Sequence, residues 1–273
     1  MQQTYGGSKM VQTDHLLHVA ADSVATVAPA PDLWQLYGVD IVSFVVSLLL
    51  LIVYYAYTGY RTRKDPTFTV QAVNMIARAE WVDSIMREPG KEVLAVQTFR
   101  NSTMAATLMA STAVFLIVGV LTLSSHGDEL QGTWHVLNIA GSTRSEMWMV
   151  KLLIMLLDLL VAFFSFSMAV RVFNHVGYMI NVPLKRNHKS LQPENVARHL
   201  NRAGSFFSLG MRAYYFGVPL MFWLFNPLFM MLSSVALVIA LYWLDRTPAS
   251  MAVDLAEETE FLKSHETSHR TAS

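Results

Sequence analysis

The sequence predicts an all-α integral membrane protein, built as a bundle of four transmembrane helices with amphipathic helices on the cytoplasmic side and both termini outside. Three observations predict this fold. Hydrophobic residues make up 53% of the 273 residues and charged residues only 15%, against roughly 25% in a typical soluble domain. Several apolar stretches are long enough to cross a bilayer, which takes about 20 helical residues. Lysine and arginine also gather in alternate connections between these stretches.

The apolar stretches define the predicted spans. They cover residues 39–57, 102–123, 148–170 and 215–244. The fourth contains Asn226-Pro227, where the missing N–H and the ring of proline predict a bend within one span. The spans divide the chain into an N-terminal tail, 1–37, a membrane domain, 38–246, and an acidic C-terminal tail, 247–273.

The distribution of basic residues predicts the orientation. The first and third connections hold most of the lysines and arginines, whereas the second connection holds only Arg144. Because short basic loops stay in the cytoplasm, we expect both to face the cytoplasm at a bacterial inner membrane. Both termini then lie on the outer, periplasmic side. Trp34, Trp148 and Trp243 are expected at the outer interface, where aromatic side chains gather.

Each basic connection contains a predicted helix. Residues 67–88 place apolar side chains on one face, and Pro89-Gly90 ends the pattern. In the other connection Pro193 suits a first helical turn, and a stripe of apolar residues follows it. We expect these amphipathic helices to lie on the inner leaflet or against each other.

Asp158 is the sharpest polar feature, because it lies near the middle of the third span, where a carboxylate is costly. Other spans place Ser47, Ser111, Thr112 and Asn226 at a similar depth, which predicts an internal polar cluster. The cluster could relay a proton or hold a cation. The alternative is a protonated Asp158 that hydrogen-bonds a neighbouring helix and only stabilises the bundle. We favour this alternative, because no second membrane carboxylate is expected to continue a relay.

A second group of polar residues lies at the cytoplasmic ends of the spans. It comprises Arg100 and Asn101 before span two, Arg171 and His175 after span three, and Arg212 before span four. Guanidinium groups beside a helix N-terminus predict a site for a phosphate or another anion. The alternative is that these arginines contact anionic lipid headgroups without forming a defined site.

Metal and enzyme chemistry find little support in the sequence. The absence of cysteine excludes disulfides, thiolate metal sites and cysteine nucleophiles. His135, Met147 and Met149 are weak candidates for a copper site on the outer face. We find no catalytic or nucleotide-binding motif, so we expect no enzyme and no cofactor. Equal numbers of acidic and basic residues, 20 of each, give no reason to expect a nucleic-acid partner.

Several motifs together resemble domain-of-unknown-function family 599, small integral membrane proteins that are widespread in bacteria and also occur in plants. The resemblance runs from about residue 38 to residue 246. It implies four spans, no established activity and no catalytic residue to assign. The motifs are Arg78-x-x-Trp81 with Met86-Arg87, Arg100-Asn101, Ala110-Ser111-Thr112, Lys151-Leu152, Ala162 to Phe166, Arg171-x-x-Asn174-His175, Gly210 to Tyr215, Pro219 and Leu241 to Arg246.

Three hypotheses follow for the function. The first is a non-catalytic, homo-oligomeric subunit that organises the membrane or a partner and contacts anionic lipid headgroups at the cytoplasmic face. The second is a channel or transporter for an ion, a proton or a small solute, centred on Asp158. The third is a copper-binding protein. The arginines and the amphipathic helices favour the first hypothesis.

Overall fold

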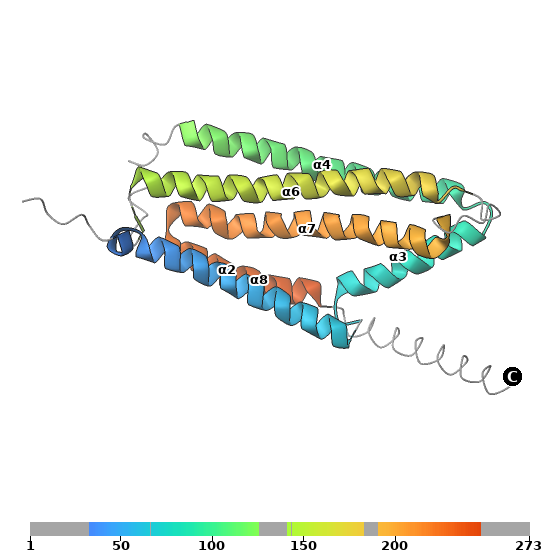
Figure 1. Cartoon of the computed structure of the whole chain (residues 1–273), viewed down its shortest axis with the longest axis horizontal. Helices are drawn as coiled ribbons and strands as arrows, with labels where there is room; N and C mark the ends of the chain where they lie inside the picture. Colours follow the sequence, from blue (N-terminus) through green and yellow to red (C-terminus); the bar gives the residue numbers. More distant parts are fainter. Residues whose placement is uncertain (1–32, 66, 126–140, 143, 183–190, 247–273) are drawn as a thin grey trace, which may run out of the picture. The chain divides into compact units, whose positions relative to one another are not determined.

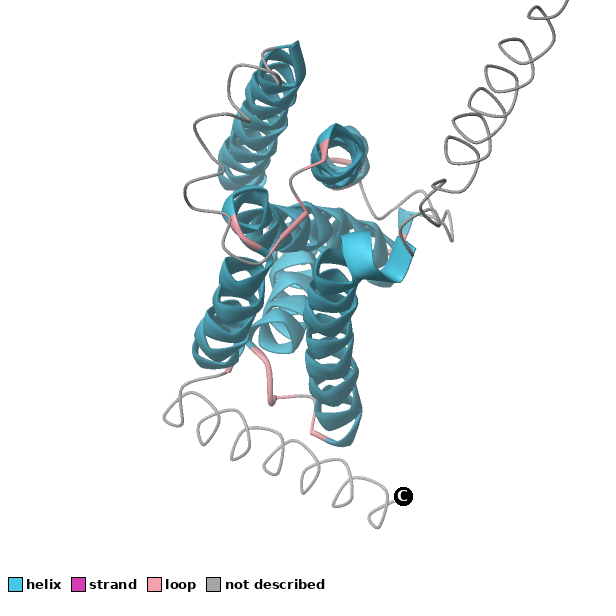
Figure 2. Cartoon of the chain, turned by 90° about the vertical axis from the view of Figure 1, so that its left-hand side faces the viewer, coloured by secondary structure: helices cyan, strands magenta, loops and turns pink. Residues whose placement is uncertain are grey.

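The computed structural model describes residues 33–65, 67–125, 141–142, 144–182 and 191–246. The chain divides into two compact units, Met1–Gly38 and Val39–Ser273. The described residues contain helices and no strand (Figure 1), and short turns join several of the helices (Figure 2). The helices are α2 (Leu33–Lys64), α3 (Val70–Arg87), α4 (Glu92–Ser125), α6 (Ser145–Met179), α7 (Pro193–Phe225) and α8 (Pro227–Asp245).

Four of these helices, α2, α4, α6 and α8, are long and apolar enough to cross a membrane. The predicted all-helical class and the four apolar helices are therefore confirmed. The helix expected over residues 67–88 is α3, which begins after Thr69. The side chain of Thr69 accepts a hydrogen bond from the N–H of Ala72, which satisfies one of the free donors of the first turn.

The predicted fourth span, residues 215–244, is wrong in its form. Helix α7 is continuous from Pro193 to Phe225, so the amphipathic segment and the apolar segment that follows it are one helix. The chain then breaks at Asn226, whose backbone is extended, and α8 starts at Pro227. The Asn226 side chain accepts a hydrogen bond from the N–H of Leu228 and caps α8, so the Asn-Pro pair ends one helix and starts another.

Helix α8 folds back along α7, and α6 packs between α4 and α7 (Figure 1). Glycine allows the close approach of α6 and α7. A Cβ atom added to Gly210 would come within 2.7 Å of the Phe166 ring, and one added to Gly217 would lie 3.4 Å from Oδ2 of Asp158. The two helices therefore pack with backbone against side chain at both positions.

Helices α2 and α8 run in the same direction. Asp40, near the start of α2, accepts a hydrogen bond from Trp223 at the end of α7. Fourteen residues further along α2, Tyr54 donates a hydrogen bond to Asp245 at the end of α8, over a distance of 2.8 Å. A single antiparallel bridge also joins Thr69 to Arg246. Residue 246 therefore lies at the end of the unit where α3 begins, and Asp40 lies at the other end.

This arrangement determines at which end of the unit residue 246 lies. An even number of crossings would return residue 246 to the side on which α2 begins, but the hairpin of α7 and α8 carries it to the opposite end. The tryptophans agree. Trp148 is buried one turn from Lys151, whereas Trp243 is exposed two residues before Asp245. The two rings therefore lie at opposite ends of the unit.

A buried ion pair joins three helices at the Asp40 end. Oδ1 of Asp40 lies 2.7 Å from Nζ of Lys151 in α6 and accepts a hydrogen bond of 3.0 Å from Nε1 of Trp223 in α7. Oδ2 accepts a hydrogen bond of 2.7 Å from the N–H of Ser142, in the connection before α6. The side chains of Asp40 and Lys151 are only 1% and 3% exposed. Asp40 is therefore a second buried carboxylate, besides Asp158, within a helix that is long and apolar enough to cross a membrane.

The sidedness of residue 246 is directly testable, because the chain contains no cysteine. We expect Arg63→Cys and Arg246→Cys to react with a membrane-impermeant maleimide from the same side of the membrane. Ser145→Cys, at the start of α6, should react from the opposite side. All three native residues are exposed, so labelling reports sidedness rather than burial. If Arg246→Cys reacts from the side of Ser145→Cys, the hairpin does not cross the membrane.

Removing one partner of the buried pair should destabilise the fold, because it leaves an uncompensated charge. We expect Asp40→Asn and Lys151→Met each to lower the free energy of unfolding by about 3–5 kcal/mol. The double variant should lose less than the sum of the two. Denaturant unfolding in detergent micelles measures all three. The exposed pair of Arg87 and Asp83 is the control, and Arg87→Gln should change stability very little. Additive losses would show that the two charges do not stabilise each other.

Candidate functional site

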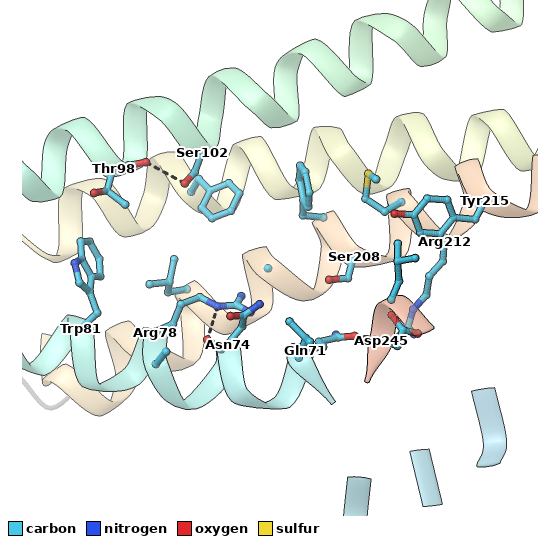
Figure 3. A pocket seen from close by; sticks show the side chains of 18 of the residues that line it. Gln71, Asn74, Arg78, Trp81, Thr98, Ser102, Ser208, Arg212, Tyr215 and Asp245 are labelled. Carbon is cyan, nitrogen blue, oxygen red and sulfur yellow. Dashed lines mark hydrogen bonds between the residues drawn. The ribbon is translucent and has the colours of Figure 1, made fainter. Parts of the chain in front are cut away.

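A cavity of about 760 Å³ lies between α3 and α7 and extends to α4 and α8 (Figure 3). Its volume is in the range of small-molecule sites in proteins. Aromatic and aliphatic side chains make up much of its wall. They are Tyr55, Val70, Ala77, Trp81, Phe99, Phe173, Leu200, Phe207, Met211, Tyr215, Leu241 and Leu244. The cavity therefore suits an apolar or amphipathic molecule better than a hydrated ion.

Arg78 brings an incompletely satisfied positive charge to this cavity. Among the described residues it makes a single hydrogen bond, from Nε to the carbonyl oxygen of Asn74, at 2.9 Å. It forms no ion pair with any described carboxylate. Burial lowers the pKa of its guanidinium, which still carries its charge at neutral pH. The terminal nitrogens of Arg78 remain available to an anion.

Gly204 of α7 makes room for Arg78. A Cβ atom at Gly204 would lie 1.5 Å from Nη1 of Arg78, so any larger residue would displace the guanidinium. Glycine inside a helix lowers helix stability by about 1 kcal/mol relative to alanine. At Gly204 this loss of helix stability leaves the space that the Arg78 guanidinium occupies. The position of Arg78 in the cavity therefore depends on residues of both α3 and α7.

Arg212 supplies a second positive charge, one that neutral groups hold in place. Its Nη2 donates a hydrogen bond of 2.8 Å to Oε1 of Gln71, and its guanidinium carbon lies 4.7 Å from the ring centre of Tyr55. A cation over an aromatic face is favourable even without a counterion. Figure 3 shows Gln71, Asn74 and Arg78 along α3, with the Arg212 side chain of α7 reaching toward the Gln71 end of this row.

Asp245 is the single acidic residue of the lining. Its Oδ2 accepts the hydrogen bond from Tyr54, and it forms no ion pair with Arg212, although both line the same cavity. The lining therefore carries two positive charges and one negative charge, and these three groups form no ion pair with one another. A polar ligand with the opposite set of charges would be complementary to it.

The structure brings only one of the predicted anion-binding residues to this cavity. Arg212 lines it, whereas the other four are exposed on α4 and α6. The His175 ring packs edge-on against the ring of His199, at 5.8 Å between centres. The four exposed residues are Arg100, Asn101, Arg171 and His175.

The residues of the predicted polar cluster around Asp158 lie in different environments, some exposed and some buried. Ser111 and Thr112 are exposed on α4, and Thr112 donates a hydrogen bond to the carbonyl of Leu108 in its own helix. Asn226 is buried and caps α8. Oγ of Ser47 and Oδ2 of Asp158 are both buried, and neither has a hydrogen-bond partner among the described residues. These two atoms are therefore not bonded to each other, and Asp158 faces Gly217 of α7.

The candidate metal ligands do not form a site in the described part of the chain. Met147 is buried, whereas Met149 is exposed and its sulfur lies 3.7 Å from Oγ of Ser124. His135 lies outside the described residues. Among those that are described, no group of three or more histidine, cysteine or acidic side chains is suited to hold a metal ion.

Sequence reasoning missed Arg78, Gly204 and Asp245 as parts of one site. Arg78 stood in the basic connection and in the family motif, but nothing local distinguished it from the other arginines. A glycine within the amphipathic stripe of α7 was a usable signal, because glycine disfavours a helix interior unless another group needs the space. Asp40 and Lys151 also carried a signal, since an acid and a base in two apolar segments can pair.

A family model described as "Protein of unknown function, DUF599" matches residues 42–250, which include all of the residues that line the cavity. No curated protein and no solved structure matches the chain.

Proposed function

The chain belongs to the DUF599 family of membrane proteins, whose description states no activity, and we propose that it is a non-catalytic, anionic-lipid-binding subunit. One observation carries the proposal: an apolar cavity that contains Arg78, a half-buried cation without a carboxylate partner among the described residues. Phosphate is a good ligand for such a group, because a guanidinium binds its oxygens through charge-assisted hydrogen bonds. The apolar wall supports an acyl chain as the rest of the ligand.

The location of the cavity supports a membrane ligand. Its wall includes α3, which lies in the basic connection between the first two apolar helices. We infer from the positive-inside rule that this end faces the cytoplasm, in a bacterial inner membrane. The cavity then lies at the depth of the inner-leaflet headgroups, and residue 246 is on the same side. Anionic lipids of that leaflet are the partners that we propose, and a homo-oligomer is the assembly that we propose.

Neutralising the two cavity arginines should release bound lipid. We expect Arg78→Gln and Arg212→Gln each to reduce the retention of phosphatidylglycerol, relative to phosphatidylcholine, by about tenfold, the factor for one lost charge-assisted hydrogen bond. Native mass spectrometry of the protein from mild detergent measures the bound lipids and counts the subunits. Gly204→Ala should have a similar effect without any change of charge, because it displaces Arg78.

Exposed arginines provide the matched controls. Arg87→Gln removes one charge from α3, and Arg171→Gln removes one from α6, both outside the cavity. Retention should be unchanged in both variants. If these controls lose as much lipid as Arg78→Gln, general charge attraction explains the binding and the cavity does not. Unchanged retention in all cavity variants would exclude the cavity as a lipid site.

Transport remains the second candidate, and Asp158 is the observation that favours it. A buried carboxylate oxygen without a hydrogen-bond partner is costly in an apolar helix unless a proton or a cation completes it. Gly217 leaves space beside this oxygen. The residue lies on α6, in the interface with α7, and no residue that lines the lipid cavity is needed for this role.

Asp158→Asn distinguishes the two candidates. If the protein conducts or transports ions, the variant should change ion flux in proteoliposomes by at least about tenfold while leaving assembly intact. If Asp158 only stabilises helix packing, flux should be identical in both proteins. Flux that is absent from both would exclude a transport role. Ser111→Ala, an exposed substitution on α4, is the control for non-specific effects.

A further inference from the structure

The charges of the cavity point beyond a general preference for anionic lipid. This inference rests on the proposed function and concerns the headgroup that the same cavity selects. Its lining carries Arg78, Arg212 and Asp245, and among the described ion pairs none involves these three residues. A lipid with only negative charges would face the Asp245 carboxylate. A headgroup with two negative groups and one positive group would match all three.

Arg212 and Asp245 are held by neighbouring residues of α2. The Tyr55 ring lies beneath the Arg212 guanidinium, and the hydroxyl of Tyr54 donates to Asp245. The two opposite charges therefore lie beside consecutive residues of α2 and form no ion pair with each other. A guanidinium and a carboxylate in this arrangement are complementary to an α-amino acid, whose carboxylate binds the arginine and whose ammonium binds the aspartate.

Arg78 lies further along the cavity. Gln71, which binds Arg212, and Arg78 are seven residues apart on α3, which corresponds to about 10 Å of helix. On α7, Gly204 and Arg212 are separated by a similar length, about 12 Å. If the guanidinium groups are separated by a length similar to these helix segments, a hydrogen bond of about 2.8 Å at each end leaves room for a phosphate joined to an amino acid by one carbon.

We propose that the cavity selects a glycerophospholipid with a serine-type headgroup. Its phosphate binds Arg78, its carboxylate binds Arg212 and its ammonium binds Asp245. A free phosphoamino acid offers the same charges, but the aromatic and aliphatic wall would then remain without a ligand. The wall therefore favours the lipid as the source of this headgroup.

Competition among lipids with identical acyl chains tests the proposal on the full-length protein. We expect phosphatidylserine to be retained at least about tenfold better than phosphatidylethanolamine or phosphatidylglycerol in native mass spectra. Asp245→Asn should reduce retention of phosphatidylserine and phosphatidylethanolamine but not of phosphatidylglycerol. It keeps an oxygen that accepts the Tyr54 hydrogen bond, so the fold is retained. Arg212→Lys keeps the charge but loses two-point binding of a carboxylate, so it should remove the preference for phosphatidylserine over phosphatidylethanolamine.

Glu80→Gln, an exposed substitution on α3, is the matched control for loss of one carboxylate, and it should change none of the retention values. Equal retention of phosphatidylserine and phosphatidylglycerol, with no effect of Asp245→Asn, would overturn the headgroup assignment and leave anionic-lipid binding in place. Lipid retention that is independent of both arginines would overturn both. If O-phosphoserine without acyl chains displaces the lipid at equal concentration, the charge pattern is correct but the lipid is not the ligand.

Discussion

The buried pair of Asp40 and Lys151 is the constraint on which the rest of the unit depends. A charge removed from water inside a membrane helix is costly, and it is tolerated only when partners surround it. Asp40 has three: Nζ of Lys151, Nε1 of Trp223 and the N–H of Ser142. Because those partners belong to α6, to α7 and to the connection before α6, the pair sets both the height and the rotation of α2. The remainder of α2 is largely exposed and apolar, and such a surface does not specify a register.

The position of α2 that Asp40 determines also affects the cavity at the other end of the bundle. Tyr54 lies fourteen residues after Asp40, about 20 Å along the helix, where it binds Asp245, and Tyr55 packs against Arg212. A rotation of α2 would remove both contacts. Helix α7 makes the second connection between the two ends, because Trp223 binds the ion pair and Gly204 leaves space for Arg78. The site is therefore assembled by helices whose relative positions are determined far from it.

Hydropathy and the basic connections were sufficient to predict an all-helical membrane protein and the starts of α3 and α7. The form of the fourth span was not predictable in the same way. Asn226-Pro227 is compatible with a kink and with a break, and the difference depends on whether α8 finds α2 and α7 to pack against. Arg212 was recognised because it begins an apolar segment. Arg78 and Asp245 were not, because their shared cavity arises from contacts between residues more than a hundred positions apart in the chain.

The two places where charge is buried differ in a way that separates a structural role from a binding role. At Asp40 both carboxylate oxygens are occupied by donors, and adding a ligand there would displace a bond. At Arg78 the described residues supply one hydrogen-bond partner, the carbonyl of Asn74, and the helix that faces it has glycine where alanine would be more stable. Asp40 thus has a full set of hydrogen-bond donors, whereas Arg78 has unused donors of its own. The free energy that an anion would recover at Arg78 is therefore available for binding, whereas the same free energy at Asp40 already stabilises the fold.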